Sequence, residues 1–183
     1  MTRSRLLGFY LFFSVFPVLA VGQDDYLKGY VITNVGDTLW GLVKDRKTSP
    51  PSKKYKKIYF KNSNKRRKKR FAPKDIKGYR AGPNSFESIW FKDAIDFFQQ
   101  EIVSVPGQGK RVFLRVEEIG HVLYYVDERQ EPGDEFVLEV DYFKKRDNPK
   151  MVRATQGLFG LKRKRLALFF ADCPPLVEKI KKK

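Results

Sequence analysis

Short runs of alternating apolar and polar residues, separated by turn sequences, make up most of the chain. Residues 30–33 and 38–43 are rich in β-branched and aromatic side chains, which favour strands, and they flank the turn sequence Asn34-Val35-Gly36-Asp37. This pattern predicts a β-hairpin over residues 28–46. Close approach of a neighbouring backbone, or a bulge, is indicated at the two glycines inside these strands, Gly29 and Gly41.

The pattern continues with two further short strands, predicted at residues 57–61 and 85–91. Polar loops are expected at residues 47–57 and 62–70, and a turn or single helical turn at 71–79 leads into another strand. Residues 93–101 are compatible with either a short helix or a strand.

Three alternating segments follow in the second half of the chain, at residues 111–117, 121–127 and 136–140. Turns are expected near Gly120 and at residues 131–134, where glycine and proline interrupt the pattern. Consecutive strands joined by short turns predict an antiparallel β-meander.

The last part of the chain changes to a helical period. Apolar residues recur at helical spacing at Leu158, Leu161, Leu166, Phe169 and Phe170. Residues 172–175 include two prolines, which end this helix and begin a second one. The second helix has one apolar face, formed by Leu176, Val177 and Ile180. We expect Leu166, Phe169 and Ile180 to pack against the sheet.

These elements together predict a mainly β (α+β) fold. Residues 23–183 are expected to form a single mature domain: a small barrel-like antiparallel sheet with a basic hairpin at 23–100, a β-meander at 101–145 and a short C-terminal helical tail at 155–183. Apolar residues make up 42% of the chain and aromatic residues 15%, which is enough for a core. With one cysteine, no intramolecular disulfide is possible, so the fold depends on that core.

Residues 1–22 have the pattern of a secretory signal peptide. Two arginines among the first five residues precede an uncharged apolar run at 6–21, and Ala20 and Gly22 are the small residues expected before a cleavage site. The apolar run is shorter than the roughly 20 residues of a membrane span. We therefore expect cleavage before Gln23, export to the periplasm or the outside of the cell, and no transmembrane segment in the mature protein.

The positive charge is concentrated in one part of the chain. The whole sequence has a formal net charge of +17, and residues 44–80 contain 17 basic residues against Asp45 and Asp75. The remaining charges of the mature chain balance. The densest run consists of Lys65, Arg66, Arg67, Lys68, Lys69 and Arg70.

This basic run has two interpretations, a solvated hairpin tip or a contact with a polyanion. The polyanions compatible with export are lipopolysaccharide, acidic polysaccharide, anionic lipid and extracellular nucleic acid. Aromatic residues alternate with the basic ones, at Tyr55, Tyr59, Phe60, Phe71, Tyr79, Trp90 and Phe91. In a binding groove they would stack on bases or sugars, whereas in strands most of them would face the core.

Motifs for catalysis or cofactor binding are weak. His121 is the only histidine, and neither a metal-binding cluster nor an HExxH motif accompanies it. Residues 107–111 lack the serine or threonine of a phosphate-binding loop. Glu117 and Glu118 are neighbours and point to opposite faces of a strand, so they form no catalytic pair. Cys173 is expected to be a small buried residue. The sequence thus predicts no cofactor or metal site.

Several short motifs resemble those of a known group of proteins. These are Gly29-Tyr30-Val31-Ile32-Thr33 with Gly36-Asp37-Thr38 and Gly41, Pro73-Lys74-Asp75-Ile76-Lys77-Gly78-Tyr79, Leu123-Tyr124-Tyr125, and Asp172-Cys173-Pro174. Over most of the mature chain the sequence resembles uncharacterised exported proteins of Bacteroidota. The resemblance implies export from a cell with two membranes and carries no known activity, so it assigns no functional residue.

Two functional hypotheses follow. The first is a non-enzymatic, envelope-associated binding or structural module that contacts anionic surfaces through residues 44–80. The alternative is an envelope hydrolase whose catalytic carboxylates are dispersed in the sequence, since such residues can meet only in the folded chain.

Overall fold

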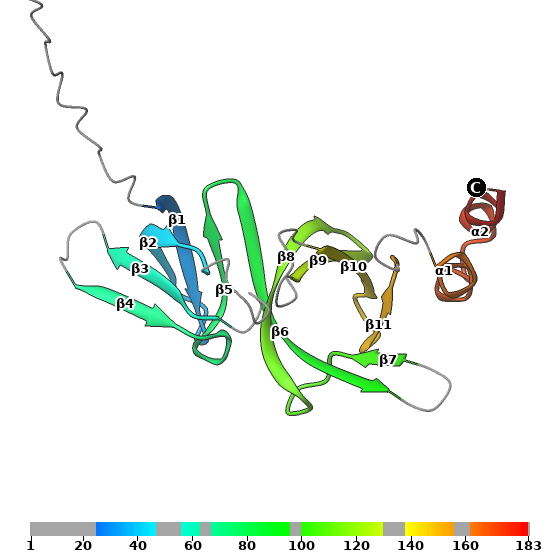
Figure 1. Cartoon of the computed structure of the whole chain (residues 1–183), viewed down its shortest axis with the longest axis horizontal. Coiled ribbons are helices and arrows are strands. Elements are labelled where there is room, and N and C mark those ends of the chain that lie inside the picture. Colours follow the sequence, from blue (N-terminus) through cyan, green and yellow to red (C-terminus); the bar gives the residue numbers. More distant parts are fainter. Residues whose placement is uncertain are drawn as a thin grey trace, which may run out of the picture.

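The computed structural model (Figure 1) describes residues 25–46, 56–62, 67–95, 100–129, 138–155 and 162–182. The signal peptide predicted at residues 1–22 lies outside these ranges, as do Tyr55, Lys65, Arg66 and the turn expected at 131–134. The described strands form one antiparallel sheet in the order β4-β3-β2-β1-β5-β6-β7-β11-β10-β9-β8.

The first five strands form the N-terminal half of this sheet. They are β1 (Tyr26–Thr33), β2 (Thr38–Lys44), β3 (Ile58–Asn62), β4 (Lys68–Phe71) and β5 (Ile76–Ala81). The predicted hairpin is confirmed as β1 and β2, and Gly36 in its turn has a φ of 108°. A single 3-10 turn, η2 (Pro73–Asp75), leads into β5, as the sequence predicted.

The remaining six strands close into a barrel (Figure 1). They are β6 (Asn84–Ile95), β7 (Gln100–Val103), β8 (Lys110–Ile119), β9 (Val122–Arg129), β10 (Leu138–Lys145) and β11 (Lys150–Arg153). The ring is completed because β6 pairs with β8, and β11 lies between β7 and β10. The long strand β6 belongs to both halves, since its first residues also pair with β5.

The expected mainly β fold, with a small antiparallel barrel and a short helical tail, is confirmed. The closed ring is formed by β6 to β11, so only β6 and the start of β7 lie within residues 23–100, the range in which the sequence analysis placed a barrel-like sheet. The meander strands β8, β9 and β10 are part of that ring. Closure depends on pairings between strands distant in sequence, and local alternation carries no information about them.

The structure revises the elements predicted at residues 62–70 and 93–101. The loop expected at residues 62–70 is shorter, because β4 begins at Lys68 and pairs with β3. Residues 93–101, left open between helix and strand, contain the end of β6 and the start of β7. The close approach expected at Gly41 is confirmed, because a Cβ there would lie 2.2 Å from the carbonyl oxygen of Lys61.

Two apolar cores lie on either side of the junction between the halves. The N-terminal core includes Val31, Val43, Ile58, Phe60, Ile76, Tyr79, Ala81, Phe86 and Phe113. The barrel interior includes Ile89, Phe91, Ile102, Val112, Leu114, Tyr125, Val140, Tyr142 and Met151. Successive residues of β8 serve both, since Phe113 points into the first core while Val112 and Leu114 point into the second. The barrel is therefore filled by side chains.

The described part of the tail contains two short helices, α1 (Arg163–Phe169) and α2 (Pro174–Lys182). The helix break predicted at residues 172–175 is confirmed, while Leu158 and Leu161 lie outside the described residues. Leu166 of α1 is buried, and α1 contacts β11. Helix α2 packs mainly on α1, and its Ile180 is half-buried.

Candidate functional site

Basic and aromatic side chains gather on one outer face of the N-terminal sheet. In an antiparallel sheet, directly paired residues share a face. The register therefore groups Lys68 with Lys61, Arg70 with Tyr59, and Lys44 with both Tyr59 and Tyr26. We call this surface the cationic face, and it comprises Tyr26, Lys28, Tyr30, Trp40, Lys44, Tyr59, Lys61, Lys68, Arg70 and Arg80.

Three lysines from three strands surround the ring of Tyr26. The Nζ atom of Lys61 lies 3.9 Å from the ring centroid, that of Lys68 lies 5.7 Å away and that of Lys44 lies 6.0 Å away. Lys44 also forms an ion pair with Asp25 at 2.6 Å. The centre of the cationic face is thus an aromatic ring within a cluster of ammonium groups.

An exposed aromatic pair occupies the neighbouring part of the face. Trp40 is 67% exposed, and its ring lies edge-on to that of Tyr30 with 5.1 Å between centroids. Arg80 pairs with Tyr30 from β5, and its Nε donates to the carbonyl oxygen of Gly82. A large exposed indole beside cations is a surface on which a sugar or base ring can stack.

A shallow hollow of 270 Å³ lies at the other edge of the face, lined by Lys56, Lys57, Tyr59 and Arg70. The guanidinium carbon of Arg70 is 5.8 Å from the centroid of the Tyr59 ring. Arginine over an aromatic ring presents its outer donors to solvent in a fixed plane. This arrangement suits a phosphate or carboxylate group.

The structure divides the basic run that the sequence singled out. Lys68 and Arg70 lie on the cationic face, whereas Lys69 pairs with Phe60 and so points to the opposite side of β4. Arg67 is exposed just before the strand. Sequence reasoning did not include Tyr26, Lys28, Tyr30 and Trp40, although they occupy alternate positions of β1 and β2. Their alternate spacing was the signal that could have predicted that they share a face of the sheet with the basic residues.

The aromatic residues within and beside the basic segment are mostly structural, as expected. Phe60, Tyr79 and Phe91 are buried, and Phe71 packs against the N-terminal core. Only Tyr59 among those in the described part of the segment lies on the cationic face.

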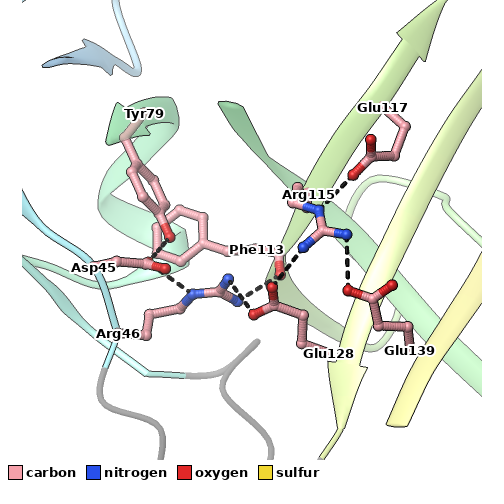
Figure 2. A network of polar contacts seen from close by, with 8 residues as sticks. All are labelled: Asp45, Arg46, Tyr79, Phe113, Arg115, Glu117, Glu128 and Glu139. Atoms are coloured by element: carbon pink, nitrogen blue, oxygen red, sulfur yellow. Dashed lines mark hydrogen bonds and ion pairs between the residues drawn. The ribbon is translucent and has the colours of Figure 1, made fainter. Parts of the chain in front are cut away.

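A network of charged side chains joins the two halves of the molecule (Figure 2). The buried guanidinium of Arg46 binds Asp45 at 3.2 Å, the carbonyl oxygen of Phe113 at 3.1 Å and Glu128 at 3.7 Å. Burial acts to lower the pKa of Arg46, but nearby Tyr79, Asp45 and Glu128 outweigh this effect and raise it. Arg46, at the end of the N-terminal hairpin, is therefore fixed against the barrel wall.

A second arginine continues the network across the barrel surface (Figure 2). Glu128 and Glu139 are directly paired on β9 and β10, where like charges repel. Arg115 lies between them, at 2.8 Å from Glu128 and 2.9 Å from Glu139, and also contacts Glu117. These carboxylates, which converge from distant parts of the sequence, are held by guanidinium groups in a structural array.

Two buried tyrosines bind carboxylates through their hydroxyl groups. Tyr79 donates to Asp45, and Tyr125 donates to Glu87 at 2.6 Å. Burial raises the pKa of Tyr79 well above its ordinary value of 10.0; Arg46 opposes this rise and Asp45 adds to it. Burial, followed by the Glu87 carboxylate, raises the pKa of Tyr125. Both phenols of the folded protein therefore keep their protons at a pH at which free tyrosine is ionised.

We expect these tyrosines to make stability fall above pH 10 and to leave it unaffected below. Phenols of the unfolded chain ionise near pH ~10, so above that pH the unfolded state binds fewer protons than the folded state. Each such tyrosine then lowers the free energy of unfolding by about 1.4 kcal/mol per pH unit, until its folded-state pKa is reached. Urea unfolding at a series of alkaline pH values measures this slope. Tyr125→Phe should make the slope shallower, and an unchanged slope would contradict the assignment.

His121 and Cys173, far apart in sequence, line the same cavity of 480 Å³ between the β8–β9 turn and the helices. Cys173 is exposed, which corrects the expectation that it is buried; it follows the last turn of α1 and lies at the surface. Within the described ranges, no group of three or more His, Cys, Asp or Glu side chains could hold a metal ion.

Arg111, which follows the glycine-rich turn at residues 107–109, has a structural role. Gly107 and Gly109 both have positive φ angles. Arg111 donates to the carbonyl oxygens of Ile76, Lys74 and Ser88, and so ties β8 to η2 and β5. Both terminal nitrogens of its guanidinium are thus bound within its own chain, one of them also by the side chain of Asn34.

The function of these sites cannot be taken from a known protein. No protein-family model, curated protein or solved structure matches the chain. Among the described residues, neither helix is long and apolar enough to cross a membrane. A functional conclusion therefore depends on the cationic face and its surroundings.

Proposed function

We propose that this protein is a non-enzymatic, exported module that binds an anionic polymer of the cell envelope along its cationic face. The observation that carries the proposal is the convergence of Lys44, Lys61 and Lys68 on the ring of Tyr26. The export it assumes is the one predicted from residues 1–22.

The arrangement of the lysines favours an anionic ligand. Lys61 and Lys68 are paired directly across β3 and β4, and like charges in that position destabilise a sheet. A carboxylate, sulfate or phosphate group between them would accept charge-assisted hydrogen bonds from both ammonium groups.

The extent of the face favours a polymer over a small anion. The face crosses five strands, from β4 to β5. With strands about 4.8 Å apart, it is about 19 Å wide. Cations lie at both of its ends, Arg70 on β4 and Arg80 on β5, with exposed Trp40 in between. Acidic polysaccharide, lipopolysaccharide and nucleic acid carry repeated negative charges joined by sugar or base rings. Such a polymer matches a face on which cations alternate with an exposed aromatic ring.

The alternative, a hydrolase with dispersed carboxylates, has less support. Asp45, Glu117, Glu128 and Glu139 do converge, but their oxygens are bound by Arg46 and Arg115 (Figure 2). A glycosidase needs two carboxyl groups on either side of a substrate bond.

The test is replacement of Lys61, Lys68 and Arg70 by serine in one variant. We expect folding to be retained, because these side chains lie on the outer face, and binding to anionic polymers to weaken. For duplex DNA used as a polyphosphate probe, loss of three phosphate contacts should make the log–log salt dependence shallower by about 2.7. Polygalacturonate serves as the carboxylate probe.

A matched variant removes the same charge elsewhere, with Lys92, Lys110 and Lys150 of the barrel replaced by serine. Its binding should stay close to that of the unaltered protein. Equal losses in the two variants would mean that net charge alone attracts the polymer. Binding unaffected by salt and by the first variant would reject the proposal.

A further inference from the structure

The helical hairpin, residues 162–182, is attached to the barrel by one of its sides. The backbone NH of Lys162 donates to the carbonyl oxygen of Ala154 at 2.8 Å, and Leu166 is 4% exposed. The ring of Phe170 meets that of Phe143 with 5.9 Å between centroids. Lys145 of β10 forms an ion pair with Asp172 at 2.8 Å. These contacts fix which side of the hairpin faces solvent.

The solvent side of the hairpin has an apolar groove of 650 Å³ between α1 and α2. Ala167, Leu168 and Ala171 line it from α1 and the following turn, and Val177 lines it from α2. Leu168 is 78% exposed, which is unusual for a leucine in a helix that also has a buried face. The groove thus gives the hairpin a second apolar side that no described part of the chain covers.

Cations surround this apolar side. Lys164 and Lys181 line the groove itself, together with Glu178. Residues 162–182 contain seven lysines and arginines against Asp172 and Glu178, and Asp172 is engaged by Lys145. The hairpin is therefore a second positively charged region, separate from residues 44–80.

The basic residues of α1 are not positioned to stabilise the helix. Residues 162–165 are all basic and lie at its N-terminal end, where the helix dipole disfavours positive charge. Burial lowers the pKa of Lys162, and the nearby Arg165 and Arg153 lower it further. A surrounding layer of anions would relieve this crowding.

We propose that the helical hairpin binds the surface of an anionic lipid bilayer. Leu168 and Val177 enter the boundary between headgroups and acyl chains, and Lys164 and Lys181 contact lipid phosphates. Amphipathic helices with a lysine-rich polar side bind membranes in this way. The aliphatic part of a lysine can lie along the apolar groove while its ammonium group reaches the headgroups.

Charge and shape favour a bilayer as the occupant. The groove is open, and its apolar residues are small apart from Leu168 and Val177. A bilayer offers a continuous anionic layer above an apolar one, which matches cations around an apolar strip. Figure 1 shows α1 and α2 at the end of the molecule opposite to β3 and β4, so the hairpin and the cationic face can be occupied together. The inference goes beyond the proposed function and does not depend on it.

The experiment places one fluorophore in the apolar groove. Cys173 lines the cavity on the barrel side of the hairpin, so it is replaced by serine, and Ala171→Cys supplies a groove position for an environment-sensitive fluorophore. The chain should begin at Gln23, so that the apolar residues 6–21 contribute no membrane binding. Vesicles of phosphatidylglycerol and phosphatidylcholine should shift the emission to the blue, and vesicles of phosphatidylcholine alone should not.

Variants separate the apolar contribution from the ionic one. Leu168→Asn combined with Val177→Asn leaves the charge unchanged and should weaken vesicle binding at least about tenfold, because two apolar side chains no longer enter the lipid. Lys164→Ser and Lys181→Ser should each weaken it about fivefold. The matched control is the variant with Lys61, Lys68 and Arg70 replaced by serine, which should bind vesicles almost as the unaltered protein does. Circular dichroism confirms folding of each variant.

Four results would overturn the inference. The first is that the fluorophore does not respond to anionic vesicles, and the second is that the Leu168→Asn, Val177→Asn variant binds them as tightly as the unaltered protein. Loss of vesicle binding in the cationic-face variant alone would assign membrane contact to that face. A response to an acidic amphipathic peptide, with none to vesicles, would mean that the groove accepts a protein partner instead. Since the hairpin variants should keep their affinity for anionic polymers, failure here is distinguishable from failure of the proposed function.

Discussion

Arg46→Ala is expected to lower the free energy of unfolding by about 3–5 kcal/mol, the cost of removing one partner from a buried ion pair. Arg46 is 5% exposed and binds Asp45, Glu128 and the backbone of Phe113 at once (Figure 2). Its guanidinium also lies 4.5 Å from the centroid of the Phe86 ring. Alanine would leave the two carboxylates with incomplete partners and create a cavity between the two cores.

Urea unfolding of Arg46→Ala measures this loss, with two variants for comparison. Arg46→Lys keeps the charge but has no planar fork to bind three groups, so an intermediate loss is expected. Arg67→Ala removes an exposed arginine of the same segment, and its effect should stay within about 0.5 kcal/mol. If Arg46→Ala unfolded at the same urea concentration as Arg67→Ala, the network would not join the two halves.

A chain that ends at Asp147 is expected to lose the closed barrel. This truncation removes the helices and also β11, which lies between β7 and β10. Met151, 6% exposed, alone contributes about 1.5–3 kcal/mol through burial. The backbone pairing of two strands is lost with it, and the sum approaches the total stability of a domain, about 5–15 kcal/mol. The unpaired edges of β7 and β10 would also promote aggregation.

A second truncation separates the strand from the helices. A chain that ends at residue 161 keeps β11 and removes only the hairpin, whose contacts with the barrel include those of Leu166, Phe170 and Asp172. Thermal unfolding should show a clearly smaller loss for this chain than for the one ending at Asp147. Equal losses would assign the stability to the helices, and a melt of the shorter chain like that of the intact protein would show that β11 is dispensable.

Local sequence determined most of the secondary structure. The turn at residues 34–37 defined the hairpin of β1 and β2, the prolines at 174 and 175 separated α1 from α2, and the break near Gly120 separated β8 from β9. These features depend on side-chain period and on turn residues, which act over a few positions. Residues 93–101 stayed open because a short apolar run fits a strand or a helix equally well.

The sequence also located the net charge, in residues 44–80, but only tertiary structure decided which of those charges act together. Arg46 resembled the other cations of its segment, yet the fold buries it between Asp45 and Glu128. Lys69 stands between Lys68 and Arg70, yet alternation places it on the other side of the sheet.

The residues that complete the cationic face came from outside the charged segment. Tyr26 and Trp40 lie beside its lysines because β1 and β2 pair with each other and β2 pairs with β3. Barrel closure likewise depends on β6 meeting β8 and on β11 meeting β7. Strand register and partner choice are set by packing of whole faces against a core, and that free energy belongs to no short segment of the chain.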